Sequence, residues 1–101
     1  MPLSIVLETL HHKRFDEALF PYGDLNRLLP FGDPSFPLLG SVDPYGNTIF
    51  NGIQMERFIK EWDCVIAKAE DQDDKELLAK VRVMANRCEA EPHTFLRFVG
   101  D

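Results

Sequence analysis

Cys88 and His93 are the only cysteine and histidine that lie close together in this sequence. A thiolate nucleophile needs a base within hydrogen-bond reach and a third group that orients the base, and Asp43 or Asp101 could be that third group. Cys88, however, falls on the apolar face of an expected helix, where a thiol packs as a small hydrophobic side chain. The sequence therefore leans against an enzyme, and a catalytic or ligand-binding site near Cys88, His93 and Asp43 is kept as the alternative.

Two adjacent histidines suggest a metal site. His11 and His12 lie between Glu8 and Asp16, whose carboxylates are suitable additional ligands. Neighbouring residues of a strand point to opposite faces of a sheet, so both histidines cannot bind one ion there. The sequence also contains no Cys-x-x-Cys pair and no glycine-rich phosphate loop. We therefore expect no metal and no cofactor, and we interpret the histidines as part of a solvated turn.

Arg97 is a single charge within an otherwise apolar segment near the C-terminus. On a covered face of a sheet a guanidinium must be paired, because an unpaired buried charge is costly. Asp43, Asp101 or Glu8 could supply the carboxylate. His93 and Arg97 are therefore candidates for a ligand site or an ion pair, and the structural ion pair is favoured for Arg97.

The remaining candidates are aromatic and polar residues in proline-rich loops. The segment from Pro30 to Ser41 carries four large apolar residues, which a flexible linker would not need. We expect an ordered loop that packs over the core, with presentation of an apolar surface as the alternative. Aromatic side chains on turns are frequent anchors of protein interfaces. The residues expected to bind a partner are Tyr22, Phe31, Phe36, Asp43, Tyr45 and Asn47.

The stretch from Ser41 to Glu70 organises the chain. It predicts a turn over Asp43–Gly46, a strand over Thr48–Phe50 and then a long helix. Asn51 is the expected N-cap of this helix, with Gln54 at the capping-box position. The apolar face of the helix is expected to contain Met55, Phe58, Ile59, Trp62, Ile66 and Ala69, with Glu61 on the opposite side. Phe50, Phe58 and Trp62 are expected at the centre of the core.

A second amphipathic helix follows the acidic link over residues 70–74. Asp73 is its expected N-cap, with Glu76 three residues later. Its apolar face is expected to contain Leu77, Leu78, Val81, Met84, Ala85 and Cys88. The short link predicts an antiparallel helix hairpin. In this arrangement Cys64 and Cys88 are too far apart for a disulfide, and we expect two buried free thiols.

Strands are expected at both ends of the chain. Leu3–Glu8 alternates in polarity, Phe15–Phe20 is a second strand or a helical turn, and Thr94–Val99 is rich in strand-forming residues. A short helix is expected over Leu25–Leu29. Together these elements predict one α+β domain over residues 1–101. Its sheet has three or four mostly antiparallel strands covered by the helix hairpin, and the first and last strands pair.

The charge balance limits the partners. The 101 residues include 17 acidic and 11 basic side chains, which gives a net charge of −6. Without a basic cluster the protein is a poor ligand for nucleic acids or anionic membranes. We find no apolar run of membrane-spanning length and no signal peptide, and free thiols are typical of a reducing cytoplasm. The expected partner is another protein, with a basic surface favoured by the acidity, or a second copy of this chain.

Three parts of the chain resemble a group of small uncharacterised bacterial proteins. The matching residues are Asp43 to Asn51, with Cys88, Pro92-His93, Leu96-Arg97-Phe98 and Gly100-Asp101 near the end, and Asp33 to Leu38 in the first half. The resemblance implies a bacterial, cytoplasmic protein and brings no activity with it. Small acidic bacterial proteins include toxin-neutralising immunity proteins. We therefore predict a non-catalytic acidic module for protein–protein interaction, for example an inhibitor of the immunity type.

Overall fold

The structure of the protein is a computed structural model that describes residues 3–11, 13–20 and 28–100. The elements in chain order are β1 (Leu3–Thr9), β2 (Arg14–Phe20), the 3-10 helix η1 (Leu39–Ser41), β3 (Asn47–Asn51), α2 (Met55–Lys68), α3 (Gln72–Ala90) and β4 (Thr94–Val99). Strands and helices therefore occupy the regions predicted for them, and the α+β class is confirmed.

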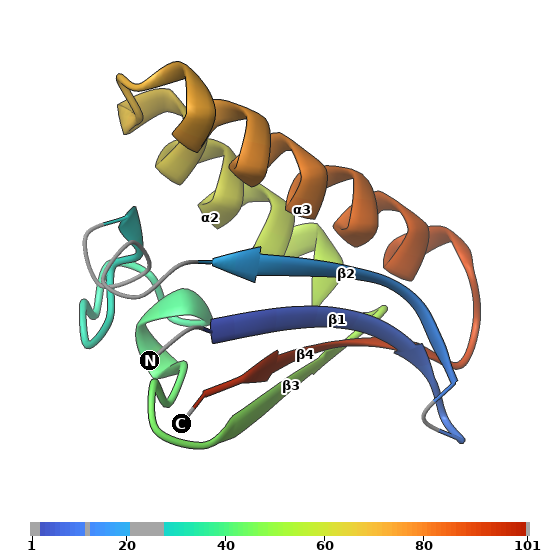
Figure 1. Cartoon of the computed structure of the whole chain (residues 1–101). Coiled ribbons are helices and arrows are strands. Elements are labelled where there is room, and N and C mark those ends of the chain that lie inside the picture. Colours follow the sequence, from blue (N-terminus) through green and yellow to red (C-terminus); the bar gives the residue numbers. More distant parts are fainter. Residues whose placement is uncertain (1–2, 12, 21–27, 101) are drawn as a thin grey trace.

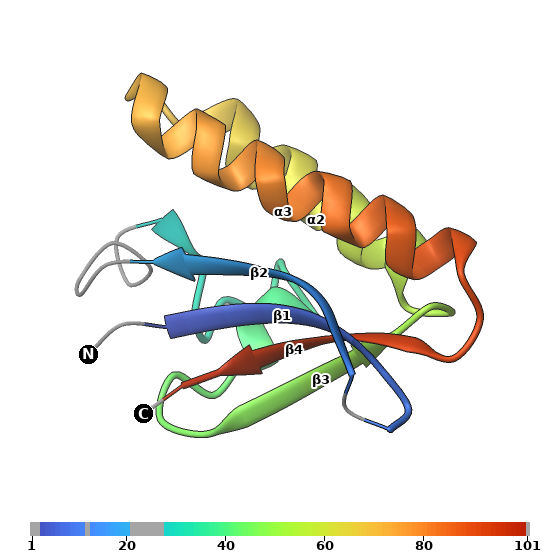
Figure 2. The same cartoon turned by 45° about the vertical axis from the view of Figure 1, so that its right-hand side comes forward.

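The strands form one antiparallel sheet in the order β2-β1-β4-β3 (Figure 1). The first and last strands of the chain pair at the centre of the sheet, as predicted. This pairing leaves β2 and β3 as the two edges. In Figures 1 and 2 no other described helix or strand runs along the outer edge of β3.

The helices α2 and α3 form an antiparallel hairpin that covers one face of the sheet (Figures 1 and 2). In β1, the side chains of Leu3, Ile5 and Leu7 are buried against this layer, as the alternating sequence predicted. The apolar face predicted for α3 is also correct. Its buried residues include Leu78, Val81, Met84, Ala85 and Cys88, with Leu77 partly buried.

Phe50, Phe58 and Trp62 form the centre of the core, as predicted, and Phe98 of β4 joins them. Contacting ring centroids in this cluster lie 5.4 to 6.4 Å apart. The indole Nε1 of Trp62 donates a hydrogen bond of 2.8 Å to the carbonyl of Leu78. The polar atom of this buried side chain is thereby satisfied, and the bond links α2 to α3.

A buried carboxylate holds the proline-rich loop against the helices. Glu61 of α2 accepts hydrogen bonds from the N–H groups of Leu38 at 3.2 Å and Leu39 at 3.0 Å. Arg57, one turn earlier, lies 3.3 Å from the same carboxylate. Glu61 was predicted to face solvent, and this prediction is wrong because the N–H groups at the start of η1 need an acceptor here. The ordered packing predicted for the loop is confirmed by the full burial of Leu39.

The buried face of α2 is rotated slightly from the predicted one. Val65 is buried although the sequence analysis left it off the apolar face. Val65 lies one helical turn after Glu61, so the two share a side of the helix. Three residues that were assigned to the buried face are only partly buried, namely Ile59, Ile66 and Ala69.

The predicted capping box before α2 forms, but the helix begins later than expected. The N–H of Asn51 donates to Gln54 Oε1 at 2.8 Å, and the N–H of Gln54 donates to Asn51 Oδ1 at 3.0 Å. The N–H of Gln54 also lies 3.2 Å from the Asn51 carbonyl, which closes a tight turn. Asn51 is therefore the last residue of β3, and α2 begins at Met55 rather than directly after Asn51.

The predicted break between α2 and α3 is confirmed, although a different residue caps the second helix. Asp71, not Asp73, is the N-cap of α3. Its carboxylate accepts from the N–H groups of Asp73 at 2.8 Å and Asp74 at 3.4 Å. The helix begins two residues earlier than predicted because Asp71 already provides the acceptor that its first turn needs.

The second strand forms over Arg14–Phe20, so the alternative of a helical turn is wrong. Its pairing with β1 shifts by one residue: Leu7 lies opposite Asp16, and Glu8 lies opposite Arg14. Phe15 is the extra residue, and the strand therefore contains a β-bulge. Most of the short helix predicted over Leu25–Leu29 lies outside the described residues.

Candidate functional site

Three of the residues predicted to bind a partner lie together on the segment that leads into β3. Asp43, Tyr45 and Asn47 are all exposed, and 80% of the Tyr45 side chain is accessible to solvent. An aromatic side chain this exposed contributes little to the fold of its own chain. This segment therefore remains a candidate for binding.

The other aromatic candidates are placed differently. Phe31 and Phe36 are partly buried and pack against the hydrophobic core. The ammonium group of Lys68 lies 5.3 Å from the centroid of the Phe36 ring. Both phenylalanines thus contribute to the packing of the proline-rich loop. Tyr22 lies outside the described residues.

Asp43 shapes the turn that presents Tyr45. The Asp43 carboxylate accepts a hydrogen bond of 2.8 Å from the N–H of Tyr45, and its carbonyl accepts from the N–H of Gly46 at 3.3 Å. The N–H of Asp43 donates to the hydroxyl of Thr48 at 2.9 Å. These bonds confirm the predicted turn, in which the aspartate binds its own backbone. Asp43 therefore fixes the position of Tyr45.

The exposed side of this segment continues through β3 with residues that the sequence analysis did not select. Ile49 is 54% exposed and Ile53 is 91% exposed. Every second residue from 43 to 53 is exposed, and we call this set the β3 surface: Asp43, Tyr45, Asn47, Ile49, Asn51 and Ile53. One signal in the sequence marks it. The segment Pro44–Met55 contains no charged residue, although 28% of the whole chain is charged.

The backbone of β3 alternates between the inner and outer sides of the sheet edge. The N–H of Gly100, just after β4, donates to the carbonyl of Gly46 at 2.6 Å. In an antiparallel pair both polar groups of a residue point the same way, and the direction alternates along the strand. Thr48 and Phe50 therefore direct their N–H and C=O groups toward β4, and the odd-numbered residues of β3 direct theirs outward.

The outward groups of Asn47 and Ile49 have no hydrogen-bond partner among the described residues. At the end of the strand, the outward N–H of Asn51 is taken by the side chain of Gln54. The open part of the edge is therefore short and runs from Asn47 to Ile49. It presents two N–H donors and two carbonyl acceptors in alternation.

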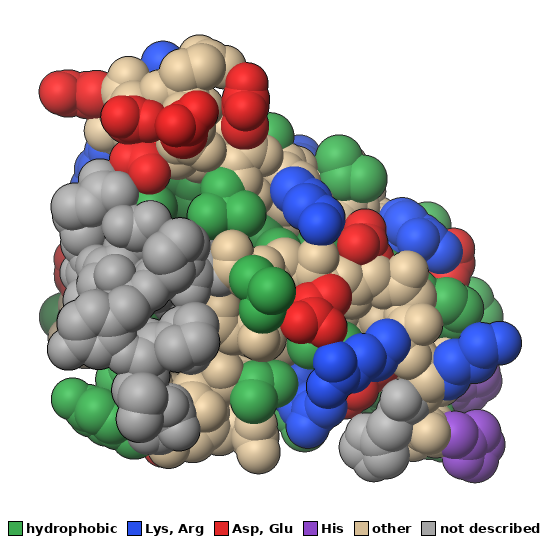
Figure 3. Space-filling view, viewed as in Figure 1, with side chains coloured by type: hydrophobic (Ala, Val, Ile, Leu, Met, Phe, Trp, Pro, Cys, Tyr) green, Lys and Arg blue, Asp and Glu red, His purple; other side chains and the backbone are tan. Residues whose placement is uncertain are grey.

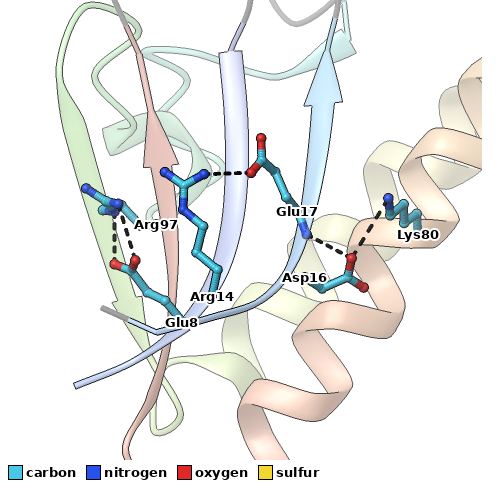
Figure 4. Close-up of polar contacts among 6 residues, drawn as sticks. All are labelled: Glu8, Arg14, Asp16, Glu17, Lys80 and Arg97. Atoms are coloured by element: carbon cyan, nitrogen blue, oxygen red, sulfur yellow. Dashed lines mark hydrogen bonds and ion pairs between the residues drawn. The ribbon is translucent and has the colours of Figure 1, made fainter. Parts of the chain in front are cut away.

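The opposite edge of the sheet, β2, is flanked by charged side chains (Figure 4). β2 carries three charges, at Arg14, Asp16 and Glu17. Arg14 Nη1 lies 2.8 Å from Glu17 Oε2, and Lys80 of α3 lies 3.9 Å from Asp16 Oδ1. The N–H of Glu17 donates to Asp16 Oδ1 at 2.8 Å. Charged side chains therefore lie along this edge, and α3 packs beside it.

Arg97 forms the predicted structural ion pair, and Glu8 is its partner (Figure 4). Arg97 Nε lies 2.9 Å from Glu8 Oε1, and Arg97 Nη2 donates to Glu8 Oε2 at 3.2 Å. Glu8 is buried although it points away from the helix layer. The pair therefore belongs to the sheet, on the face opposite the helices.

The alternative site near Cys88, His93 and Asp43 is not assembled as a triad, because Cys88 and His93 border one groove and Asp43 does not. Cys88 is buried, and its thiol donates to the carbonyl of Thr94 at 3.5 Å. Burial raises the pKa of the Cys88 thiol above its ordinary value, which favours the unreactive protonated form. β3 and β4 are antiparallel, so Asp43 precedes one end of the pair and His93 lies beyond the other. The paired strands between them span about 17 Å.

The two cysteines are free, as predicted, but their environments differ. Cys88 lies in the core, whereas Cys64 is exposed on α2, so the prediction that both thiols are buried is wrong for Cys64. Val65, the next residue, faces the core in its place.

Two shallow grooves flank the connection from α3 to β4. One, of about 360 Å³, includes Leu10 and Phe15, and the other, of about 400 Å³, includes Ile53. His93 borders both grooves, is exposed and has a positive φ of 59°. Within the described part of the chain, no group of three or more His, Cys, Asp or Glu side chains could hold a metal ion. The second groove also has Cys88, Glu89 and Glu91 in its lining, but its cysteine is the buried thiol described above.

Acidic side chains gather over the connection between α2 and α3 (Figure 3). Glu70, Asp71 and Asp73 are exposed there, and Asp71 is occupied as the N-cap of α3. None of the described helices is both long enough and apolar enough to cross a membrane.

Comparison with known proteins gives no match among family models, curated proteins or solved structures. The resemblance to small bacterial proteins therefore stays a prediction. Its two main segments do lie side by side, because Asn47–Asn51 pairs with Phe95–Val99.

Proposed function

We propose that the protein is a non-catalytic module that binds another polypeptide, and that this partner adds a strand along the outer edge of β3. The observation that carries the proposal is the open edge itself. Asn47 and Ile49 present free N–H and C=O groups within a segment that has no charge. An extended polypeptide is the ligand whose own alternating groups match such an edge.

The side chains of the β3 surface support the same kind of partner. Tyr45, Ile49 and Ile53 are exposed apolar residues spaced along the edge. Backbone pairing supplies affinity in strand addition, and contacts between side chains on alternate positions supply specificity. A partner strand with apolar residues on one face would meet these three side chains.

The burial and raised pKa of Cys88 support the proposal that the protein is not a cysteine-dependent enzyme. A nucleophilic cysteine needs an accessible thiolate, whereas this thiol is buried with a raised pKa. The free thiols also support a cytoplasmic location. The net charge of −6 favours a neutral or basic partner over an acidic one.

A pair of substitutions at one position tests the proposal. Asn47 is the first residue of β3 and its N–H points outward, so proline is tolerated there without loss of a bond to β4. Asn47→Pro removes the outward donor and blocks the edge, whereas Asn47→Ala removes only the side chain. A library of displayed peptides is selected on the wild-type protein, and the bound peptides are then measured on both variants.

We expect peptides that bind the wild-type protein and Asn47→Ala alike and lose binding to Asn47→Pro by about tenfold or more. Equal binding to all three proteins would contradict strand addition at β3. Circular dichroism and urea unfolding of Asn47→Pro serve as the control that its fold is intact.

A further inference from the structure

We infer that the polypeptide bound at β3 is a second copy of this protein, paired antiparallel through the same edge. The inference rests on the proposed function, because it names the partner of that edge. It follows from the positions of the free backbone groups, the exposed apolar residues and the charges along the segment.

The free groups select one register. Asn47 and Ile49 are the residues of β3 whose outward N–H and C=O groups have no partner within the described chain. If Asn47 of each copy lies opposite Ile49 of the other, all of these groups pair and four hydrogen bonds form. Centring the pair on Ile49 instead would form two such bonds and place Asn47 opposite Asn51, whose N–H is already taken by Gln54.

The selected register is symmetric. Thr48 of one copy lies opposite Thr48 of the other, and a two-fold axis passes between them. An interface of this kind uses the same surface on both copies and closes as a dimer. The two four-stranded sheets would then form one continuous sheet of eight strands. Neither copy would keep its β3 edge open.

The exposed apolar residues favour a second copy over a foreign strand. Ile53 and Tyr45 are the two most exposed large hydrophobic residues in the described chain, at 91% and 80%, and they flank opposite ends of β3. Antiparallel pairing brings the start of β3 of one copy, with Tyr45 just before it, beside the end of β3 of the other, with Ile53 just after it. The same contact occurs twice, so a single pairing covers both exposed residues on both copies.

The distribution of charge permits this pairing. Two copies of a chain with a net charge of −6 repel each other, yet no charge lies between Pro44 and Met55. The repulsion therefore acts over a distance and is screened by salt. We expect added salt to tighten the dimer. A basic partner attracted to the acidic surface would show the opposite dependence on salt.

Sedimentation equilibrium and amide hydrogen exchange are measured over a range of protein concentration. The interface is short, so we expect the wild-type protein to dimerise at concentrations on the order of 100 µM. The amides of Asn47 and Ile49 exchange rapidly in dilute protein and become protected as the dimer forms. Asn47→Pro removes two of the four hydrogen bonds and raises the dissociation constant by about tenfold or more, whereas Asn47→Ala stays close to wild type.

Disulfide cross-linking tests the register. In a Cys64→Ser background, which removes the exposed native thiol, Thr48→Cys places two thiols across the two-fold axis. The β-carbons of such a pair lie about 4.5–5.5 Å apart, close enough for a disulfide with a small adjustment. Asn51→Cys is the matched control, because the two copies of Asn51 lie about 20 Å apart in this register. We expect a cross-linked dimer from Thr48→Cys alone.

The outcomes separate this inference from the proposed function. A monomer at every concentration overturns self-pairing, and the function stands if displayed peptides still distinguish Asn47→Pro from Asn47→Ala. A monomer without such peptides overturns both. A dimer that is indifferent to Asn47→Pro, or that cross-links through Asn51→Cys as well as Thr48→Cys, uses another interface and overturns the inference.

Discussion

The two edge strands of this sheet, β2 and β3, differ in the features that prevent pairing with another strand. β2 carries charges at Arg14, Asp16 and Glu17, contains a bulge at Phe15 and lies beside α3. β3 has no charge, no proline within the strand and no shift in its register. Charges, bulges and covering helices are the usual means by which proteins prevent unwanted pairing at a sheet edge. They are present on one edge of this sheet and absent from the other.

This difference indicates which edge is available for binding. Both edge strands carry exposed apolar side chains, such as Leu19 on β2 and Ile49 on β3. Exposure of a hydrophobic residue alone would therefore not distinguish them. The charges and the bulge distinguish them, and within the described chain the outward N–H of Glu17 on β2 is also taken by Asp16, whereas both outward groups of Ile49 have no partner.

β3 is open but firmly anchored at both ends. At its start, Gly100 donates to the carbonyl of Gly46, and at its end Asn51 and Gln54 exchange two hydrogen bonds. An edge that is already held in the extended conformation loses less entropy when a partner strand binds. Substitutions that weaken either anchor should therefore change the ability of β3 to pair without affecting β2.

The largest effect is expected from Gly100→Ala. A β-carbon at this position would lie 2.4 Å from the carbonyl oxygen of Pro44 and 2.8 Å from that of Gly46. These are backbone atoms, so the turn before β3 must shift. We expect the free energy of unfolding in urea to fall by about 1–3 kcal/mol and dimerisation to weaken.

Leu19→Ala is the matched control on β2. Leu19 is 60% exposed, so its truncation should change the free energy of unfolding by no more than about 0.5 kcal/mol. A Gly100→Ala protein as stable as the wild type would show that the start of β3 is not held by this close contact.

The contrast between the edges shows what the sequence could predict. Local patterns were sufficient for β1, β3, β4, both helices and the aromatic core around Trp62, because alternation and helical spacing determine which face is apolar. For β2 they left a helical turn open as an alternative. They were also sufficient for the Asp43 turn and for the bonds between Asn51 and Gln54. These features depend on residues that are close together in the sequence.

What the sequence did not reveal depends on distant contacts. Ile49 and Ile53 form a surface only because β3 is an edge, and the order of the strands decides that. Glu61 is buried only because the loop at Leu38 and Leu39 approaches it from more than twenty residues away. Neither position differs in residue type from an ordinary strand isoleucine or a solvated glutamate, so no local pattern identified them.

A smaller effect is expected from Gln54→Ala. This change removes the acceptor for the outward N–H of Asn51 and one half of the capping box. We expect the free energy of unfolding to fall by about 0.5–1 kcal/mol. The open edge also becomes longer, so dimerisation should tighten by about threefold.

The control for this change is Gln54→Glu at high salt, which keeps an acceptor for Asn51. Because salt screens the added charge, its dimerisation should stay close to that of the wild-type protein under the same conditions. Sedimentation equilibrium measures both variants. If Gln54→Ala dimerises more weakly than the wild-type protein, the turn after β3 favours dimerisation by keeping the strand rigid. This effect would then be larger than the loss caused by Gln54 occupying the N–H of Asn51.

The smallest effect is expected from Lys80→Ala, which removes the ion pair between α3 and β2 and leaves Arg87 of α3 over the Phe15 ring. Lys80 and Asp16 are 3.9 Å apart and their side chains are 50% and 37% exposed, so the pair contributes at most about 0.5 kcal/mol to stability. Arg14, Glu17 and the bulge remain, and they should keep β2 from pairing. The measurement is sedimentation of Lys80→Ala combined with Asn47→Pro, in which β3 is blocked and any association reports on β2. A monomer would mean that the protection of β2 does not depend on Lys80, whereas a dimer would mean that the ion pair with α3 provides it.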